Sequence, residues 1–96
     1  MTASFHGLAK VELNEAAHYY EAESPGLGTA FLAEAEHAVA AILEHPESSP
    51  RIVRAIRRRL LRRFPYGVIY RVCGEHVRVL AVMNLRRRPA YWVGRV

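Results

Sequence analysis

The sequence predicts a single α+β domain in which an antiparallel helical hairpin packs on one face of an antiparallel sheet. Apolar residues recur at helical spacing through most of the first half of the chain, and they alternate at strand spacing through much of the second half. The length of 96 residues suits one domain rather than two. We therefore expect residues 1–96 to form one unit, with a short N-terminal strand, two helices and a sheet of three to four antiparallel strands.

The first helix follows a short strand that we expect at residues 3–6. Between residues 8 and 23, apolar side chains recur every three or four positions, which places them on one face of a helix. These positions are Ala9, Leu13, Ala16 and Tyr20. The segment Ser24-Pro25-Gly26 should end this helix, because proline disfavours helical geometry at the residue before it.

The second helix should begin near Leu27 or Thr29 and end at His45-Pro46. Its apolar stripe consists of Phe31, Ala35, Ala38, Val39 and Ile42. The alanines of this stretch favour helix and allow a neighbouring helix to approach closely. Two amphipathic helices separated by so short a break predict a helical hairpin.

Three strands are expected in the second half, at residues 56–62, 66–73 and 77–83. Apolar and polar residues alternate along the last two, and Gly74-Glu75 between them is typical of a tight turn. Pro65 lies between the first two strands, where it removes a backbone donor.

Charge is divided unequally between the two halves of the chain. Residues 1–50 contain one lysine and eight glutamates, a net charge of −7. Residues 51–96 contain thirteen arginines and one glutamate, a net charge of +12. If the glutamates belong to the helices and the arginines to the sheet and tail, the two signs should lie on opposite sides of the molecule. Such a field attracts anionic partners.

Several classes of protein are not indicated. The five histidines are scattered and none forms a ligand pair beside a cysteine, so we expect no metal and no cofactor. The longest apolar runs are far shorter than the roughly 18 residues of a membrane span, and no signal peptide is visible at the N-terminus. The single cysteine, Cys73, fits a reducing cytoplasm and is expected to be buried in its strand.

Two basic stretches are the candidate binding surfaces. The first lies around residues 55–70 and includes Arg57, Arg59, Arg62 and Arg63. A single arginine there is explained as an edge residue that resists aggregation, but the cluster predicts an anionic partner. The second is the tail, with Arg86, Arg87, Arg88, Tyr91 and Trp92.

Arginine and aromatic residues are common anchors of protein interfaces. The alternative for Tyr91 and Trp92 is that they fold back and cap the core. For Tyr19, Tyr20 and Tyr70 we expect simple packing.

An ordered series of residues resembles the RelE/ParE family of bacterial toxins. The series comprises Leu13, Ala17, Tyr19, Tyr20, Glu21, Gly26-Leu27-Gly28, Phe31, Arg62-Arg63-Phe64-Pro65-Tyr66, Tyr70, Ala81-Val82 and Arg87. The likeness is greater to the ParE-like branch than to the RelE branch. It implies a small cytoplasmic toxin that arrests growth, and a cognate antitoxin that neutralises it by wrapping an acidic or amphipathic segment across it. It also implies a hetero-oligomer of toxin and antitoxin.

The resemblance leaves two targets to weigh, because one branch of the family cleaves messenger RNA on the ribosome and the other poisons DNA gyrase. Metal-free RNA cleavage needs a base, a cation and an acid. Arg86 or Arg87 and Tyr91 match two of the nuclease positions. Gly67 stands where RelE-type nucleases have an arginine, and Met83-Asn84 where other family nucleases have a histidine. The catalytic set is therefore incomplete.

We accordingly predict a gyrase inhibitor, more a binding protein than an enzyme. The first alternative is a ribosome-dependent endoribonuclease of the RelE type that uses Arg86, Arg87 and Tyr91. The second alternative is a non-catalytic nucleic-acid-binding module, since phosphate contacts need only cations.

Overall fold

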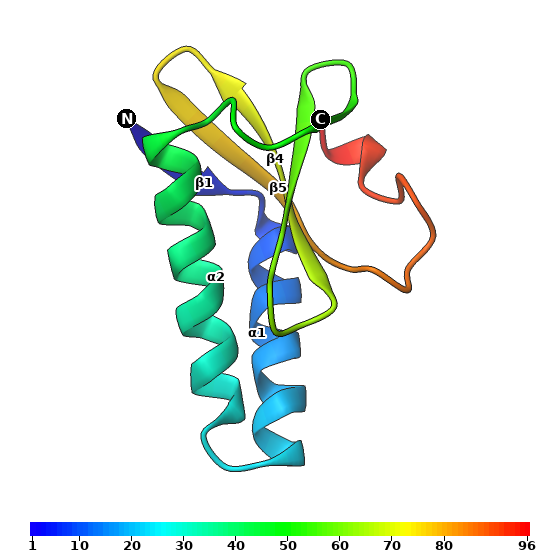
Figure 1. Ribbon diagram of the computed structural model, residues 1–96. Helices are drawn as coiled ribbons and strands as arrows, with labels where there is room; N and C mark the ends of the chain where they lie inside the picture. The colour runs from blue at the N-terminus through cyan, green and yellow to red at the C-terminus, as the bar shows by residue number, and fades with distance from the viewer.

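The computed structural model describes residues 1–96 and confirms the α+β class. Two helices lie side by side against one face of a sheet, and the C-terminal segment crosses to the other face (Figure 1). The elements in chain order are β1 (Thr2–Phe5), α1 (Gly7–Glu23), α2 (Leu27–Glu44), β2 (Arg51–Val53), β3 (Ile56–Leu60), β4 (Tyr66–Cys73), β5 (His76–Asn84) and the 3-10 helix η1 (Val93–Arg95).

The sheet differs from the prediction in strand number and direction. It has five strands in the order β1-β5-β4-β3-β2, and β1 runs parallel to β5 while all other pairs are antiparallel. The helical hairpin follows β1 and supplies the long connection that parallel pairing requires. The strand β2 was not predicted, because its three residues are all exposed and too few to show a period.

The two helices approach closely at Gly28, the second residue of α2. A Cβ atom at this position would overlap the backbone carbonyl oxygen of Ala17 on α1. The turn between the helices is held by Glu21, which accepts hydrogen bonds from the backbone N–H groups of Gly26 (2.9 Å) and Gly28 (3.0 Å). These bonds, the one from Gly26 above all, lower the pKa of the Glu21 carboxyl.

The main core lies between the helices and the sheet. An aromatic cluster of Tyr20, Phe31, Phe64 and Tyr66 has ring centroids 4.8 to 6.1 Å apart. Tyr70 is fully buried and donates its hydroxyl to the carbonyl oxygen of Pro46 at 2.8 Å. The expectation that tyrosines pack therefore holds for Tyr20 and Tyr70. It is wrong for Tyr19, whose side chain is 59% exposed although its ring contacts Tyr20 edge-on.

A smaller core covers the opposite face of the sheet. Trp92 is 2% exposed and packs there with Ile56, Ile69, Leu80, Ala81 and Met83. Trp92 therefore caps the core, as the alternative for the tail predicted, and it is not part of an exposed binding patch.

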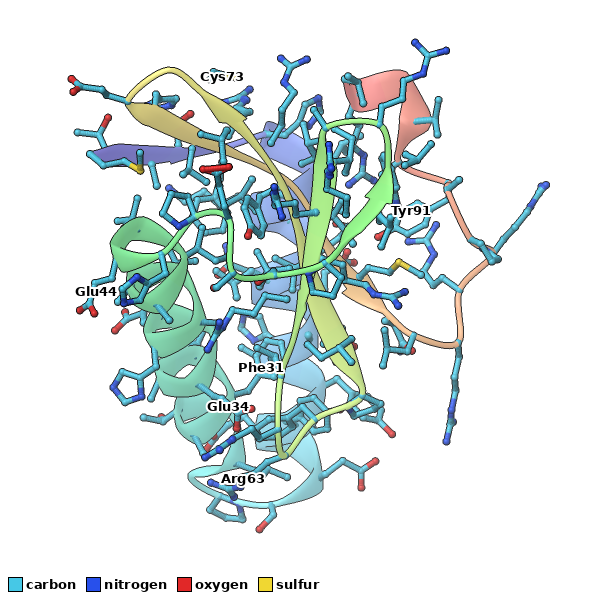
Figure 2. The ribbon with its side chains drawn as sticks, turned by 45° about the horizontal axis from the view of Figure 1, so that its top comes forward. Phe31, Glu34, Glu44, Arg63, Cys73 and Tyr91 are labelled. Carbon is cyan, nitrogen blue, oxygen red and sulfur yellow. The ribbon has the colours of Figure 1, made fainter.

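Cys73 is exposed rather than buried, because it ends β4 at the β4–β5 turn (Figure 2). Neither helix has the length and apolar character needed to cross a membrane.

The close approach at Gly28 makes a testable prediction. Gly28→Ala should lower the free energy of unfolding by about 1–3 kcal/mol, because a methyl group there forces α1 and α2 apart. Gly7→Ala is the matched control, since Gly7 is the first residue of α1 and has open space around it. Chemical denaturation measures both, and equal stability of the two variants would contradict the packing described.

Candidate functional site

The structure separates the nine predicted binding residues into distinct places. Arg57 lies on β3, and Arg59, Arg62 and Arg63 lie beside α2. Arg86, Arg87 and Arg88 lie in the loop after β5, while Tyr91 and Trp92 pack back against the body of the protein. The nine residues therefore do not form one continuous surface.

Arg57 has a structural role. Its guanidinium donates to the backbone carbonyl oxygens of Ser49 (2.6 Å) and Glu47 (3.0 Å), in the loop that leads into β2. Its distance to the Glu47 carboxylate is 3.9 Å, and that carboxylate is 82% exposed, so the ion pair adds little. Because the fork of Arg57 is used to hold this loop, it is not available to a partner.

A groove runs between α2 and β3, and Arg59, Arg62 and Arg63 line it together with Leu60 and Leu61. Glu34 on α2 accepts hydrogen bonds from the backbone N–H groups of both Arg62 and Arg63. Glu34 and Arg63 lie near the α1–α2 turn in Figure 2. The carboxylate thus fixes the backbone of the β3–β4 turn, whereas neither guanidinium forms an ion pair. Both side chains are exposed, and the guanidinium of Arg63 lies over the Phe64 ring, 5.5 Å from its centroid.

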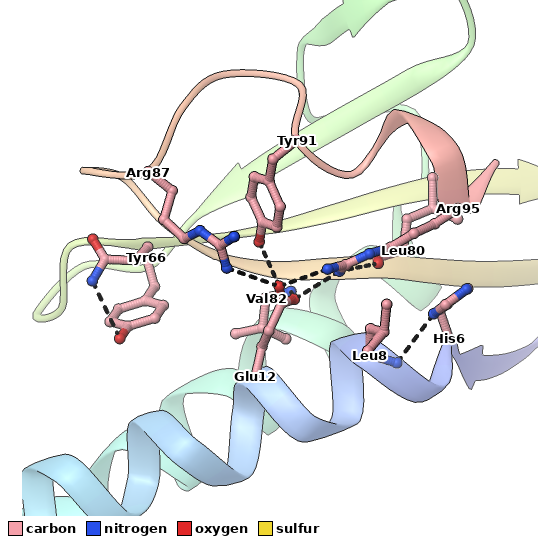
Figure 3. A network of polar contacts seen from close by, with 10 residues as sticks. His6, Leu8, Glu12, Tyr66, Leu80, Val82, Arg87, Tyr91 and Arg95 are labelled. Atoms are coloured by element: carbon pink, nitrogen blue, oxygen red, sulfur yellow. Dashed lines mark hydrogen bonds and ion pairs between the residues drawn. The ribbon is translucent and has the colours of Figure 1, made fainter.

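The carboxylate of Glu12, on α1, is the centre of the largest polar network in the molecule (Figure 3). It accepts hydrogen bonds from the backbone N–H of Val82 (3.0 Å), the hydroxyl of Tyr91 (2.7 Å) and two nitrogens of Arg95 (2.9 and 3.0 Å). Its side chain is only 13% exposed. This network ties α1, β5 and the C-terminal segment together.

The Glu12–Arg95 pair also completes the sheet. The strand β1 ends at Phe5, which pairs with Val79, so the outer edge of β5 beyond that point has no neighbouring strand. Glu12 accepts the N–H of Val82, and Arg95 donates to the carbonyl oxygen of Leu80 at 3.0 Å. An ion pair therefore satisfies backbone groups that an adjacent strand would otherwise bind.

Arg87 and Tyr91 are occupied by the same network. The guanidinium of Arg87 lies over the Tyr91 ring, 3.9 Å from its centroid, and 3.6 Å from the Glu12 carboxylate. Burial, followed by the hydrogen bond to Glu12, raises the pKa of the Tyr91 hydroxyl. Glutamate and arginine thus meet across the molecule here, so the predicted separation of charge is incomplete.

A second groove, of about 480 Å³, lies between α1 and the end of β5. Its aromatic side is formed by Tyr19, Tyr20 and Tyr66, and Arg86 lines it from the loop. Asn84 accepts a hydrogen bond from the backbone N–H of Arg86 at 2.9 Å, which fixes the start of the loop. Sequence reasoning missed Tyr19 as a surface residue, because its helical position alone did not show which face the sheet would cover.

Of the positions compared with nucleases, Gly67 and Met83 lie apart from this groove, whereas Asn84 lines it. Gly67 faces away from the helices, and a Cβ atom there would lie 3.1 Å from Cγ of Arg58, whose side chain runs over it. Met83 is buried in the smaller core. No group of three or more histidine, cysteine or acidic side chains is placed to hold a metal ion.

Comparison with known proteins identifies the family. A family model described as the ParE toxin of the type II toxin–antitoxin system parDE matches residues 3–89. The chain belongs to the ParE toxin family. This confirms the resemblance to the RelE/ParE toxins, and ParE membership implies an antitoxin as a partner. A comparison with curated protein sequences found no match.

A solved structure supports the ParE fold. The structure titled "Chromosomal ParDE TA system from P. aeruginosa" is similar to this chain with a TM-score of 0.78 and 18% sequence identity. The alignment covers 90% of this chain and 97% of the other. At this identity the likeness shows the shared fold alone.

The Glu12 network predicts a large effect of one substitution. Glu12→Gln should lower the free energy of unfolding by about 2–4 kcal/mol, because Arg95 and Arg87 lose their counter-charge in a half-buried site. Glu15→Gln, also on α1 but exposed, should change it by less than about 0.5 kcal/mol. Chemical denaturation compares the two, and similar losses would refute the special role of Glu12.

The raised pKa of Tyr91 predicts a pH dependence. Above about pH 10 the unfolded chain ionises this tyrosine while the folded chain keeps it protonated. Its contribution to stability is therefore fully present below that pH and is lost as the pH rises toward the folded-state pKa. Stability measured between pH 9 and pH 11, as rough limits, should decrease less steeply in Tyr91→Phe, and identical slopes would contradict the assignment.

Proposed function

We propose that this ParE-family protein arrests growth by binding DNA gyrase in the cytoplasm, without catalysis, until a cognate antitoxin neutralises it. The observation that carries the proposal is the division of the arginines. Arg62, Arg63, Arg86 and Arg88 are exposed and form no ion pair, whereas Arg57, Arg87 and Arg95 are bound internally. Arg86 shares a groove with an exposed aromatic residue, Tyr19. Exposed arginine and aromatic side chains suit an interface with another macromolecule.

The same geometry gives less support to RNA cleavage. Of the residues considered for a nuclease, Arg87 and Tyr91 contact Glu12 and each other. A general acid works best with a pKa near the working pH, and burial moves the pKa of Tyr91 in the opposite direction. Arg86 alone remains free, and one cation does not supply a base and an acid.

In this proposal, the antitoxin neutralises the toxin by binding to its positively charged surfaces. The second half of the chain carries +12, and its free guanidinium groups line the groove beside α2 and the loop after β5. An acidic segment of the antitoxin that folds on these surfaces would cover the arginines that we assign to the target.

Growth and supercoiling assays test the proposal. Induction of the protein alone should stop bacterial growth, and co-expression of the antitoxin should restore it. The purified protein should inhibit gyrase supercoiling or trap cleaved DNA, and it should leave ribosome-bound messenger RNA intact. Cleavage of that RNA without an effect on gyrase would replace the proposal with the nuclease alternative.

A pair of double variants tests the surface itself. Arg86→Ala with Arg88→Ala should weaken gyrase inhibition at least tenfold, or about 1.4 kcal/mol, because two exposed guanidinium groups are removed from the interface. Arg51→Ala with Arg54→Ala removes the same charge from the β2 edge and should change inhibition by less than about threefold. Thermal melts followed by circular dichroism should show that both variants are folded. Equal losses of inhibition would mean that inhibition depends on the net charge of the protein and not on this surface.

A further inference from the structure

A cluster of basic and hydroxyl side chains lies on the face of the sheet that the helices leave uncovered, toward the β4–β5 turn. Its members come from three strands, and the register brings them together: Thr2 pairs with His76, Ser4 with Arg78, and Arg78 with Arg71. Residues that pair in register share a face. Arg71 alternates with Ile69, which belongs to the smaller core, so this is the face opposite the helices.

Arg71 and Arg78 form a like-charged pair across β4 and β5. No carboxylate lies within ion-pair distance of either, since the ion pairs of the molecule involve only Arg57, Arg87 and Arg95. Like charges directly opposite each other destabilise a sheet. Both side chains are also partly buried, which reduces the screening that water provides. The pair therefore lacks a counter-ion within the chain.

A chain of hydrogen bonds holds Arg78 in place. One terminal nitrogen of Arg78 donates to Oγ of Ser4 at 3.0 Å, and this oxygen lies 2.7 Å from Nε2 of His76. The other ring nitrogen of His76 lies 2.8 Å from Oγ1 of Thr2. The guanidinium of Arg78 is thus anchored through one nitrogen, and its remaining N–H groups have no acceptor in the chain.

The Nε–H group of Arg71 is buried and has no hydrogen-bond partner. Buried donors in folded proteins are nearly always satisfied, so we expect this group to have an acceptor, either a water molecule or an anion, that the chain itself does not supply. An oxyanion placed between the two guanidinium groups would supply that acceptor and also the missing negative charge.

We propose that Arg71 and Arg78, with the hydroxyl of Ser4, form a binding site for a phosphate group. Two guanidinium forks offer more donors than the two oxygens of a carboxylate can accept, whereas a phosphate has three or four oxygens. A phosphate monoester also carries nearly two negative charges, which balances the two arginines. This site is separate from the arginines assigned to gyrase and does not depend on that assignment.

Thermal unfolding of the full chain tests the site with inorganic phosphate as the probe. At constant ionic strength, replacing chloride with phosphate should raise the melting temperature and approach a limit set by binding to the folded state. Arg71→Gln should lose this increase, and in chloride it should be at least as stable as the parent because the like-charged pair is gone.

Two further variants distinguish a built site from general charge. Arg71→Lys keeps the positive charge but loses the planar guanidinium group with its paired N–H donors, and it should bind phosphate at least tenfold more weakly. Arg51→Gln removes one exposed arginine from the same sheet and should bind phosphate as the parent does. Equal losses in Arg51→Gln and Arg71→Gln, or no phosphate effect beyond that of chloride in the parent, would overturn the proposal.

The resonance of the Arg71 Nε–H group gives a second, local measurement. It should shift on addition of phosphate and should not shift on addition of chloride. If Arg71→Gln fails to fold, this readout in the parent still decides the matter, since an unmoved signal at saturating phosphate overturns the site.

Three ligands distinguish the possible sources of the phosphate group. Adenosine monophosphate, a short oligonucleotide with a 5′-phosphate and the same oligonucleotide without it are titrated against the parent and Arg71→Gln. Dependence on Arg71 for both phosphorylated ligands indicates a free nucleotide or a strand end, and dependence for the 5′-phosphorylated strand alone indicates nucleic acid. Either outcome supports a site for a terminal phosphate, whereas an acidic peptide that binds through Arg71 more tightly than any of them would overturn it.

Discussion

The carboxylate of Glu12 is the contact on which the arrangement of the molecule most depends. It is the only acidic side chain that joins the first half of the chain to the C-terminal segment, and it does so from the inner side of α1. Because β1 is only four residues long, the edge of β5 beyond it would otherwise lack partners. The Glu12–Arg95 pair occupies that edge and fixes where the tail can run.

The position of the tail in turn decides which arginines are available. Trp92 closes the smaller core, and Tyr91 and Arg87 stack above Glu12. The basic tail therefore does not extend into solvent as one cationic patch. Its free charges are confined to the loop between β5 and Tyr91, next to the aromatic groove beside α1.

The sheet consequently presents two kinds of basic surface. On the side of the helices, free arginines border grooves between helix and strand, a shape suited to a macromolecular partner. On the other side, Arg71 and Arg78 are held in register by the strands themselves and lack an internal counter-ion. A ParE-family toxin that uses both surfaces would combine a protein contact with a phosphate contact.

The sequence alone determined the order of the elements other than β2 and η1, the two-helix hairpin and the hairpin of β4 and β5, because periodicity and turn residues act over a few positions. It also determined the family, since the ordered residues that carry the likeness span most of the chain. Only the tertiary structure decided that β1 is parallel to β5, that Tyr19 is exposed and that Trp92 is buried. It also decided that Arg57 and Arg87 are bound while Arg86 is free. These outcomes depend on contacts between residues far apart in the chain, such as Glu12 with Arg95. A local sequence pattern does not predict which distant charged group a side chain will contact.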